Sequence, residues 1–555
     1  MYKKNLLAAI LFILLFQLTK AQNEFITVWN PSLPSAGQGT PGSSGNTQIW
    51  FPGTGTDYTI YWEEIGYPSH HATLTNVTSQ YQILIDFGTP LNPEPAQATY
   101  RIKVSNGNGN FQRIAFSNAD VPPGITILGD NFKILKVEQW GNISWSSMAG
   151  AFYECRALDV TATDIPDLSN ATNMSYMFAN CFNLTGNPTI NNWDISHITS
   201  LVGTFSGCFL FNQPIGGWDT SNVTMMEVMF MLAMKFNQPI GNWNTSKVVT
   251  TTAMFQNAQT FNQPVGNWDM SKNTDAELMF ANAAQFNQPI GSWNTSQIVE
   301  MNFMFFNAKA FNQNISNWDT GNVKYMDGMF FSAEKFNSDI TNWNVSKVER
   351  MQNMFNNAKI FNQNVGKWDV KSVKNMTSMF DNATDFNQSL GEWELNSLQF
   401  AANMLRNTAI TCQNYDETLF GWSQNPLVAS NIDLSSVSPL VYSGTNAVSA
   451  RNFLMSNKSW IISGDTYDGE CSPKLSTSDL KMNQKKPLYP NPARDIIYIR
   501  IPHTESYTIY DLSGRVVSKG SLTDQHINIQ SLTPGNYLLQ LRTKENIQNL
   551  KFTKQ

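Results

Sequence analysis

Charged residues are scarce in this sequence. Only 14% of its 555 residues are Asp, Glu, Lys or Arg, and the formal net charge is −6, with no basic run or patch. Contacts to nucleic-acid phosphates need clustered Lys and Arg, so the composition argues against nucleic-acid binding. The five histidines and five cysteines form no zinc-ligand spacing and no Ser/His/Asp or Cys/His catalytic arrangement. The sequence therefore predicts a protein that is not an enzyme, with no catalytic residues, metal or cofactor.

Long apolar runs are also missing beyond the N-terminus. Leu6 to Phe16 is an apolar segment that follows two lysines, and a small-residue site ends at Ala21, before Gln22. This is the pattern of a secretory signal peptide over residues 1–21, cleaved between Ala21 and Gln22. No other stretch reaches about 18 uninterrupted apolar residues, so we expect no membrane span in the mature protein.

A 25-residue unit dominates the sequence between residues 138 and 410. Its clearest mark is a tryptophan at every 25th position: Trp193, Trp218, Trp243, Trp268, Trp293, Trp318, Trp343, Trp368 and Trp393. One such unit cannot bury its apolar face alone and must stack on its neighbours. The period therefore predicts a one-dimensional stack of turns.

Each unit contains two kinds of apolar pattern. A short stretch from Phe211 to Trp218, interrupted by Pro and Gly, suits one β-rung and a turn. From Val223 to Ala233 the apolar residues fall at i, i+3, i+6, i+7 and i+10, which predicts a short helix capped by Ser221. The predicted fold is an α/β repeat solenoid with one short strand and one short helix per turn. The Trp and Phe rows are expected in its core, with an exposed aromatic platform for sugars as the alternative.

Polar side chains also recur at fixed positions. The Asn after the second Phe of each unit, as in Asn212, is expected to bond the neighbouring turn, with ligand contact as the alternative. From Asp219 to Asp369 the residue after the Trp alternates between Asp and Asn, which favours a turn acceptor over a calcium ligand. The next polar position of the rung is our candidate for ligand binding. It comprises Gln213, Gln238, Gln263 and Gln288.

The repeat phrase Phe-Asn-Gln-Pro-Ile-Gly-Asn-Trp, clearest from residue 236, resembles the BspA-like leucine-rich-repeat surface proteins, whose 25-residue repeats are of the DUF285 type. The resemblance implies a leucine-rich-repeat-like solenoid on a bacterial surface, with some members acting as adhesins. It carries no catalytic residues to transfer. Residues 411–471 are similar to the C-terminal cap that follows such repeats. Before them, alternating runs in residues 22–137 predict a small antiparallel β domain.

The cysteines fall into two groups. Cys155, Cys181 and Cys208 each lie three residues after a repeat Phe, in a small slot that later turns fill with Ala. Buried free thiols are expected there, and a disulfide between neighbouring turns is the alternative. Cys412 and Cys471 bracket the cap, and an exported protein can oxidise them, so they are our candidate disulfide.

Residues 472–486 form a polar linker, and residues 487–555 contain short alternating strands joined by Gly, Pro and Asn turns, which predicts a β-sandwich. The phrases Tyr489-Pro490-Asn491-Pro492 and Asp511-Leu512-Ser513-Gly514-Arg515 resemble the type A sorting domain of type IX secretion. The resemblance implies a bacterium of the Bacteroidota. It also implies passage across the outer membrane by the type IX machinery to the cell surface or the medium.

Three function classes follow from these features. The leading one is a non-catalytic surface binding protein or adhesin that recognises an extracellular protein or glycan through the repeats. The second is a structural surface-layer or spacer protein without a specific ligand, which the near-identity of the repeats favours. An enzyme is third and requires an acid pair in the N-terminal β domain.

Overall fold

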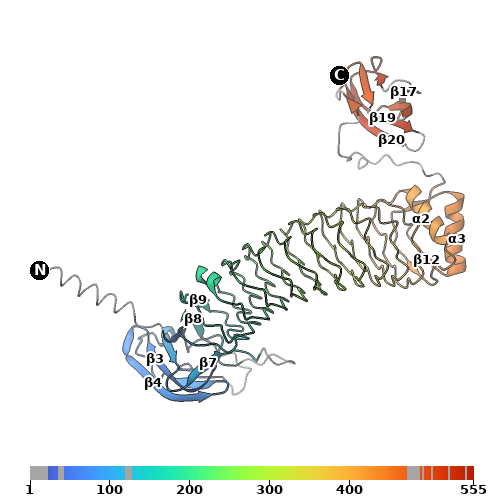
Figure 1. Ribbon diagram of the computed structural model, residues 1–555. Coiled ribbons are helices and arrows are strands. Elements are labelled where there is room, and N and C mark those ends of the chain that lie inside the picture. Colours follow the sequence, from blue (N-terminus) through green and yellow to red (C-terminus); the bar gives the residue numbers. More distant parts are fainter. Residues whose placement is uncertain are drawn as a thin grey trace. The chain divides into compact units, whose positions relative to one another are not determined.

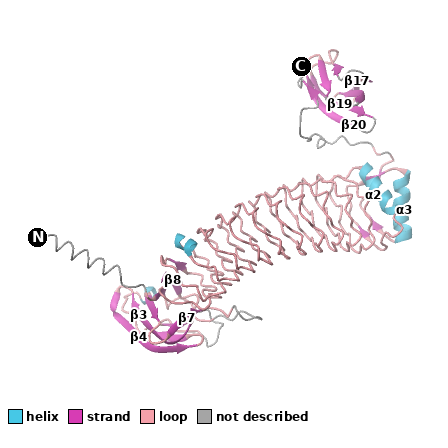
Figure 2. Ribbon diagram, in the orientation of Figure 1, coloured by secondary structure: helices cyan, strands magenta, loops and turns pink. Residues whose placement is uncertain are grey.

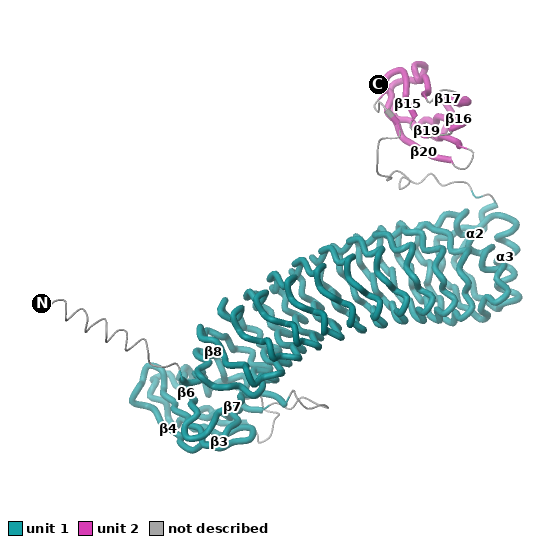
Figure 3. Tube along the Cα trace, in the orientation of Figure 1, with its two compact units in different colours: residues 1–471 teal, residues 472–555 magenta. Residues whose placement is uncertain are grey.

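The structure is a computed structural model with two compact units, residues 1–471 and residues 472–555 (Figure 3). The residues that it describes are 23–34, 43–118, 128–469, 471, 488–489, 493–499, 501, 504–522, 526–543 and 547–555. The expected signal peptide with its Ala21–Gln22 cleavage site and the linker 472–486 lie outside the described residues.

The N-terminal part of the first unit is a β domain. In Figure 1 this domain includes the labelled strands β3, β4 and β7. Its main sheet has the strand order β4-β3-β6-β1-β8-β9, with β7 paired to β3, and β2 pairs β5 in a second sheet. In chain order the elements are β1 (Phe25–Trp29), β2 (Gln48–Phe51), β3 (Gly53–Glu64), β4 (Tyr67–Ser79), β5 (Ile83–Asp86), the 3-10 helix η1 (Pro95–Gln97), β6 (Tyr100–Ser105), β7 (Asn110–Ile114), β8 (Ile134–Gln139) and β9 (Asp159–Val160).

The main sheet leads directly into the repeats. Every pairing in it is antiparallel except the last, where β8 pairs β9 in parallel with Val137 opposite Val160. The alternating residues Tyr100, Ile102 and Val104 of β6 are fully buried, as a half-buried strand requires. The β domain therefore covers the first turn of the repeats. Without this cover, the apolar interior of that turn would be in contact with water.

The prediction of an α/β solenoid is wrong. In the repeat stack, which we define as residues 146–410, the helical element is the 3-10 helix η2 (Pro188–Asn192), and the segments predicted to be helices are successive turns (Figure 2). Adjacent turns are joined by single parallel bridges, for example between Thr250 and Asp275 and between Asp275 and Glu300. Apart from β9 and η2 near its start, the stack is thus a coil of tight bends without helices or extended strands.

The backbone of one turn shows why no helix forms. The amide groups of Met226, Val228, Phe230 and Leu232 donate to carbonyls of the next turn, whereas an α-helix needs them to donate four residues back. Val228 and Leu232 have φ of 49° and 62°, in the left-handed region that ends a right-handed helix. The Asp or Asn after each Trp is a turn acceptor, as predicted. Asp219 Oδ1, for example, accepts from the backbone N–H of Ser221 at 2.9 Å.

The aromatic rows lie inside the stack, as expected. Trp293 is 3% exposed, and its ring stacks on that of Trp318 with centroids 6.1 Å apart. Within one turn, the rings of Phe280 and Phe286 stack at 3.8 Å. Cys155, Cys181 and Cys208 are buried and free, as predicted. The core is therefore a continuous column of rings, which dispersion and the hydrophobic effect both stabilise.

A helical cap closes the other end of the stack. Its elements are α2 (Cys412–Gln424), β10 (Asp433–Leu434), β11 (Val441–Tyr442), α3 (Thr445–Lys458), β12 (Ile461–Ile462) and β13 (Thr466–Tyr467). Thr411 caps α2 by accepting from the Asn414 amide, and the predicted disulfide joins Cys412 to Cys471. No helix in the described part of the chain is long and apolar enough to cross a membrane.

The second unit is built from two sheets with the strand orders β14-β15-β18 and β17-β16-β19-β20. They share one core that contains Ile497, Ile509, Leu539 and Leu541, which makes the unit a small β-sandwich. The strands are β14 (Leu488–Tyr489), β15 (Ile496–Ile499), β16 (Thr504–Tyr510), β17 (Val516–Ser521), β18 (His526–Asn528), β19 (Gly535–Thr543) and β20 (Ile547–Lys554).

Candidate binding surface

The four glutamines predicted to bind ligand are half-buried and bond the preceding turn. Gln238 Nε2 donates to the carbonyl of Asn212 at 2.9 Å, and Gln263 and Gln288 donate to the side-chain oxygens of Asn237 and Asn262. Gln213 Nε2 donates to the carbonyl of Thr185. Ligand binding by these four residues stays a prediction, but their side-chain N–H groups already donate hydrogen bonds to the preceding turn.

The asparagine row has the structural role that the sequence indicated. Asn262 Oδ1 accepts from the backbone N–H of Asn287 at 2.9 Å, and Asn287 Oδ1 accepts from that of Asn312 at the same distance. The pattern continues up to Thr411, whose amide donates to Asn387 Oδ1. A side-chain oxygen acceptor is needed at every turn for this row to continue, and Asn supplies it from Asn212 to Asn387.

A different surface varies strongly from turn to turn. We define the bridge face as the residues that form the parallel bridges and those two and three positions later in the chain. The nine successive bridge residues from Ser200 to Phe400 are nine different amino acids: Ser200, Met225, Thr250, Asp275, Glu300, Tyr325, Arg350, Asn375 and Phe400. All except Ser200 are exposed or half-buried. A backbone bridge needs no particular side chain, so the fold leaves these positions free to change.

Carboxylates cluster on one part of the bridge face. Burial raises the pKa of Glu277, and the neighbouring Asp275 raises it further. The pKa of Glu300 is also raised, first by burial and then by Asp275 and Glu277. Burial likewise raises the pKa of Glu227, whose Oε2 atom is buried without a hydrogen-bond partner. These groups are held close together at a cost in electrostatic free energy.

Farther along the stack the carboxylates are paired. Asp327 forms an ion pair with Arg350, and Asp381 accepts from Arg406 Nε at 2.8 Å. Within the described residues, no ion pair within 4.0 Å involves Glu227, Asp275, Glu277 or Glu300. The bridge face is therefore acidic over its middle turns and balanced in charge beyond Asp327.

Apolar side chains lie beside these carboxylates in unfavourable backbone conformations. Leu278 and Phe303 have φ of 57° and 54°, where a bulky residue is strained by about 1 kcal/mol or more. The next turn has Gly328 at this position, and a Cβ there would lie 2.3 Å from the Phe303 ring. Phe303 also makes an edge contact with Phe306, with centroids 6.0 Å apart. If this position only had to adopt the left-handed backbone conformation, a residue with a lower conformational cost would suffice. Asn353, two turns after Phe303, is an example.

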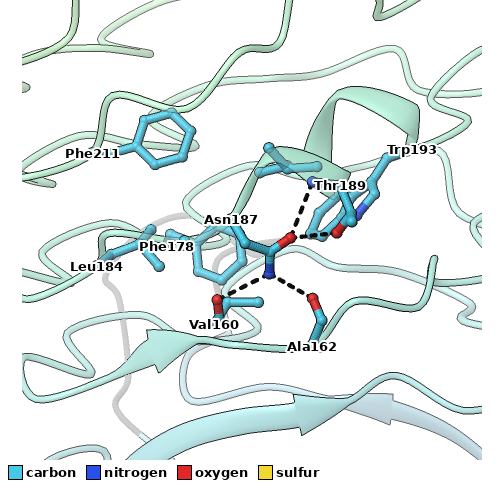
Figure 4. A pocket seen from close by; sticks show the side chains of 10 residues that line it. Val160, Ala162, Phe178, Leu184, Asn187, Thr189, Trp193 and Phe211 are labelled. Carbon is cyan, nitrogen blue, oxygen red and sulfur yellow. Dashed lines mark hydrogen bonds between the residues drawn. The ribbon is translucent and has the colours of Figure 1, made fainter.

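One small cavity lies between the first turns and the regular ones, next to η2 (Figure 4). Its lining includes Phe178, Asn187, Trp193 and Phe211, and the space open to a water molecule inside it is about 10 Å³. Asn187 is fixed by bonds to the carbonyls of Val160 and Ala162. The Trp193 indole N–H has no partner there. The cavity has room for about one water molecule and is too small for a metabolite.

The cap brings one group of potential metal ligands together in the described part of the chain. The side-chain ligand atoms of Cys412, Asp416 and Cys471 lie within 4.8 Å of one another. Both sulfurs belong to the disulfide, and Asp416 accepts hydrogen bonds from the amides of Ser443 and Gly444. The group therefore serves to fix the cap.

Sequence reasoning missed the bridge face because it searched for repeated residues. The bridge face is revealed by the positions that differ between aligned turns, and not by the positions that repeat. The glutamine positions were selected for being polar and periodic, and periodicity is what an internal hydrogen-bond row requires.

Comparison with known sequence families agrees with the two units. Residues 146–265, 233–340 and 313–418 match the family described as Mycoplasma protein of unknown function, DUF285. Residues 487–555 match the secretion system C-terminal sorting domain. A comparison with curated proteins gave no match. The chain thus contains DUF285 repeats over residues 146–418 and, at residues 487–555, a sorting domain that directs it through the type IX secretion system to the cell surface or the extracellular space.

Proposed function

We propose that the exported protein is a non-catalytic binding protein, an adhesin, that recognises an extracellular protein or glycan through the bridge face of its repeat stack. The observation that carries this proposal is the contrast between the two kinds of position. Nine turns share one tryptophan row and carry nine different residues at the bridge positions. The fold does not dictate the side chains at the bridge positions, so these exposed or half-buried positions are available for recognition.

The chemistry of the middle turns supports a recognition role. Glu277 and Glu300 are held beside Asp275 without an ion pair, and Leu278 and Phe303 occupy strained backbone positions next to them. Unfavourable local features of this kind persist where function needs them. The resemblance of the repeats to those of BspA-like surface proteins supports the same function.

A structural surface-layer or spacer protein is the second candidate. The observation that favours it is the uniform side of the stack, where the asparagine row and the glutamine donors repeat with little change. A spacer has no specific ligand, so no extracellular macromolecule should raise its melting temperature. A binding protein is stabilised by its ligand, by about 2.7 kcal/mol when the ligand is at 100 times the dissociation constant.

The test is a binding screen of the mature protein on arrays of glycans and matrix proteins. We expect at least one ligand, and the triple substitution Glu277→Gln, Glu300→Gln, Phe303→Asn should weaken its binding. The matched control is Asn242→Ala with Asn267→Ala, which changes exposed residues on the uniform side of the stack.

A variant with Gln238→Ala and Gln263→Ala separates the bridge face from the glutamine row. Loss of binding only in this variant would place the site on the glutamines and contradict the proposal. A screen with no ligand and no shift in melting temperature would favour the spacer.

A further inference from the structure

The turn between β16 and β17 of the sorting domain presents an apolar side chain to solvent. Leu512 at its tip is 79% exposed, which makes it the most exposed large apolar residue in the described part of the chain. Most apolar residues of this domain are inside the shared core of its two sheets. Isolated exposed leucines are common on protein surfaces, so the conformation of the turn around Leu512 decides whether this side chain can act as a contact point.

Hydrogen bonds hold the turn from Asp511 to Arg515 in a defined conformation. Asp511 Oδ1 accepts from the Ser513 amide at 2.9 Å, from the Ser513 hydroxyl at 2.6 Å and from the Arg515 amide at 3.1 Å. Two backbone bonds close the loop, from Asp511 N–H to the Arg515 carbonyl and from Gly514 N–H to the Asp511 carbonyl. Gly514 has φ of 82°, which only glycine adopts at low cost.

The same network positions a cation beside the leucine. Arg515 Nε donates to Asp511 Oδ2 at 3.1 Å, while 79% of the arginine side chain remains exposed. The turn therefore presents one apolar side chain and one guanidinium in a fixed relation. A preorganised turn of this kind loses little conformational entropy on binding, and Arg is enriched among the residues that dominate interface energetics.

We propose that the turn from Asp511 to Arg515 is a recognition element of the sorting domain, with Leu512 as its anchor. The partner is a protein of the type IX secretion machinery that offers an apolar pocket with a carboxylate at its rim. This assignment rests on the sorting-domain match and is independent of what the repeat stack binds.

Export of the full-length chain from the bacterium that encodes it tests the assignment. The substitution Leu512→Asn should reduce the fraction of protein outside the outer membrane and leave the remainder in the periplasm. Truncation of an anchor residue usually weakens binding by about tenfold or more, so a large fall is expected. Leu512→Met keeps a long apolar side chain and should be exported like the parent.

The matched control is Ile547→Asn, at an apolar residue of the same domain that is 46% exposed in β20. It should be exported normally, and both Asn variants should resist proteolysis like the parent because neither position is in the core. Normal export of Leu512→Asn would overturn the proposal. An equal loss of export in Ile547→Asn would also overturn it, because the effect would then belong to the domain surface in general.

Discussion

The indole nitrogen of Trp293 donates a hydrogen bond of 3.0 Å to the backbone carbonyl of Val265 in the preceding turn. The same bond, 28 residues back along the chain, recurs from Trp218 to Trp393. The tryptophan row therefore has two functions. Its rings fill the core, and its N–H groups satisfy carbonyls that the corners of the stack would otherwise bury without a partner.

Trp293→Ala should lower the free energy of unfolding by about 3 to 5 kcal/mol, because it removes a buried ring and leaves a cavity. Trp293→Phe should cost less, since it keeps most of the apolar volume and loses the bond to Val265. Chemical denaturation of the purified protein measures both effects. A loss below about 1 kcal/mol for Trp293→Ala would contradict a buried, continuous row.

The Asn262 side chain accepts two bonds from the next turn, from the Asn287 amide at 2.9 Å and from Gln288 Nε2 at 3.0 Å. Asn262→Ala leaves both donors without their partner, and we expect a loss of about 1 to 3 kcal/mol. Asn267→Ala, at an exposed corner of the same unit, should be neutral within about 0.5 kcal/mol. Thermal unfolding of the two variants side by side tests the row, and equal melting temperatures would show that the row contributes nothing.

The sequence was sufficient to predict several features of the fold. The period of 25 placed the Trp and Phe rows in the core, the phrases after residue 487 indicated a β-sandwich, and the position of Cys412 and Cys471 indicated a disulfide. Each of these depends on large, rare or covalent features that tolerate few alternatives. The aromatic rows are visible in one sequence because the repeats supply an internal comparison.

The helix prediction failed for a physical reason. Consecutive tight turns return to the same side about every three to four residues, so Met226, Met229 and Ala233 line up as they do on a helix. The distinguishing signal was the recurring Asn at positions such as Asn257 and Asn282, both with φ near 60°. Asn is the non-glycine residue that most readily adopts this conformation, and its repetition indicates a left-handed residue in every turn.

The carboxylates of the bridge face predict a particular dependence of stability on pH. A carboxyl whose pKa is raised in the folded state binds its proton more readily there than in the unfolded chain. Its contribution to stability is complete below the unfolded value of about 4.3 and is lost as the pH rises through the folded value. Glu277 and Glu300 are both of this kind.

The double variant Glu277→Gln, Glu300→Gln should therefore melt at a higher temperature than the parent at pH 7 and at the same temperature near pH 4. Glu349→Gln is the control of opposite sign, because Lys374 lowers the pKa of Glu349. Its effect at pH 7 should be small and unfavourable, since exposed ion pairs contribute little. Scanning calorimetry at the two pH values tests the difference, and a double variant less stable than the parent at pH 7 would refute it.

The disulfide between Cys412 and Cys471 should stabilise the cap. It closes a loop with a sequence separation of 59, for which chain entropy gives about 4 kcal/mol. Replacing both cysteines by Ser should lower the melting temperature and expose α2 and α3 to protease first. A triple Ala variant of Cys155, Cys181 and Cys208 controls for thiol effects, and it should keep the parent's sensitivity to reductant. A reductant that leaves the parent's melting unchanged would show that the bond contributes little.

The modular stack allows the binding face to be removed without disturbing the rest. Deleting residues 262–311 joins Phe261 to Asn312 and restores the Phe-Asn phrase at the junction. The deletion takes out two whole turns with Asp275, Glu277, Glu300 and Phe303. Because each turn contacts only its neighbours, the shortened stack should fold, and its thermal unfolding should remain cooperative.

A second deletion of the same length, residues 337–386, joins Phe336 to Asn387 and spares the acidic turns. We expect the first deletion to abolish binding to the ligand found on the arrays and the second to retain most of it. Surface plasmon resonance on both proteins measures this difference. Equal weakening by the two deletions would mean that avidity along the whole stack decides the affinity. Unchanged binding in both would place the site in the N-terminal β domain and leave the repeats as a stalk.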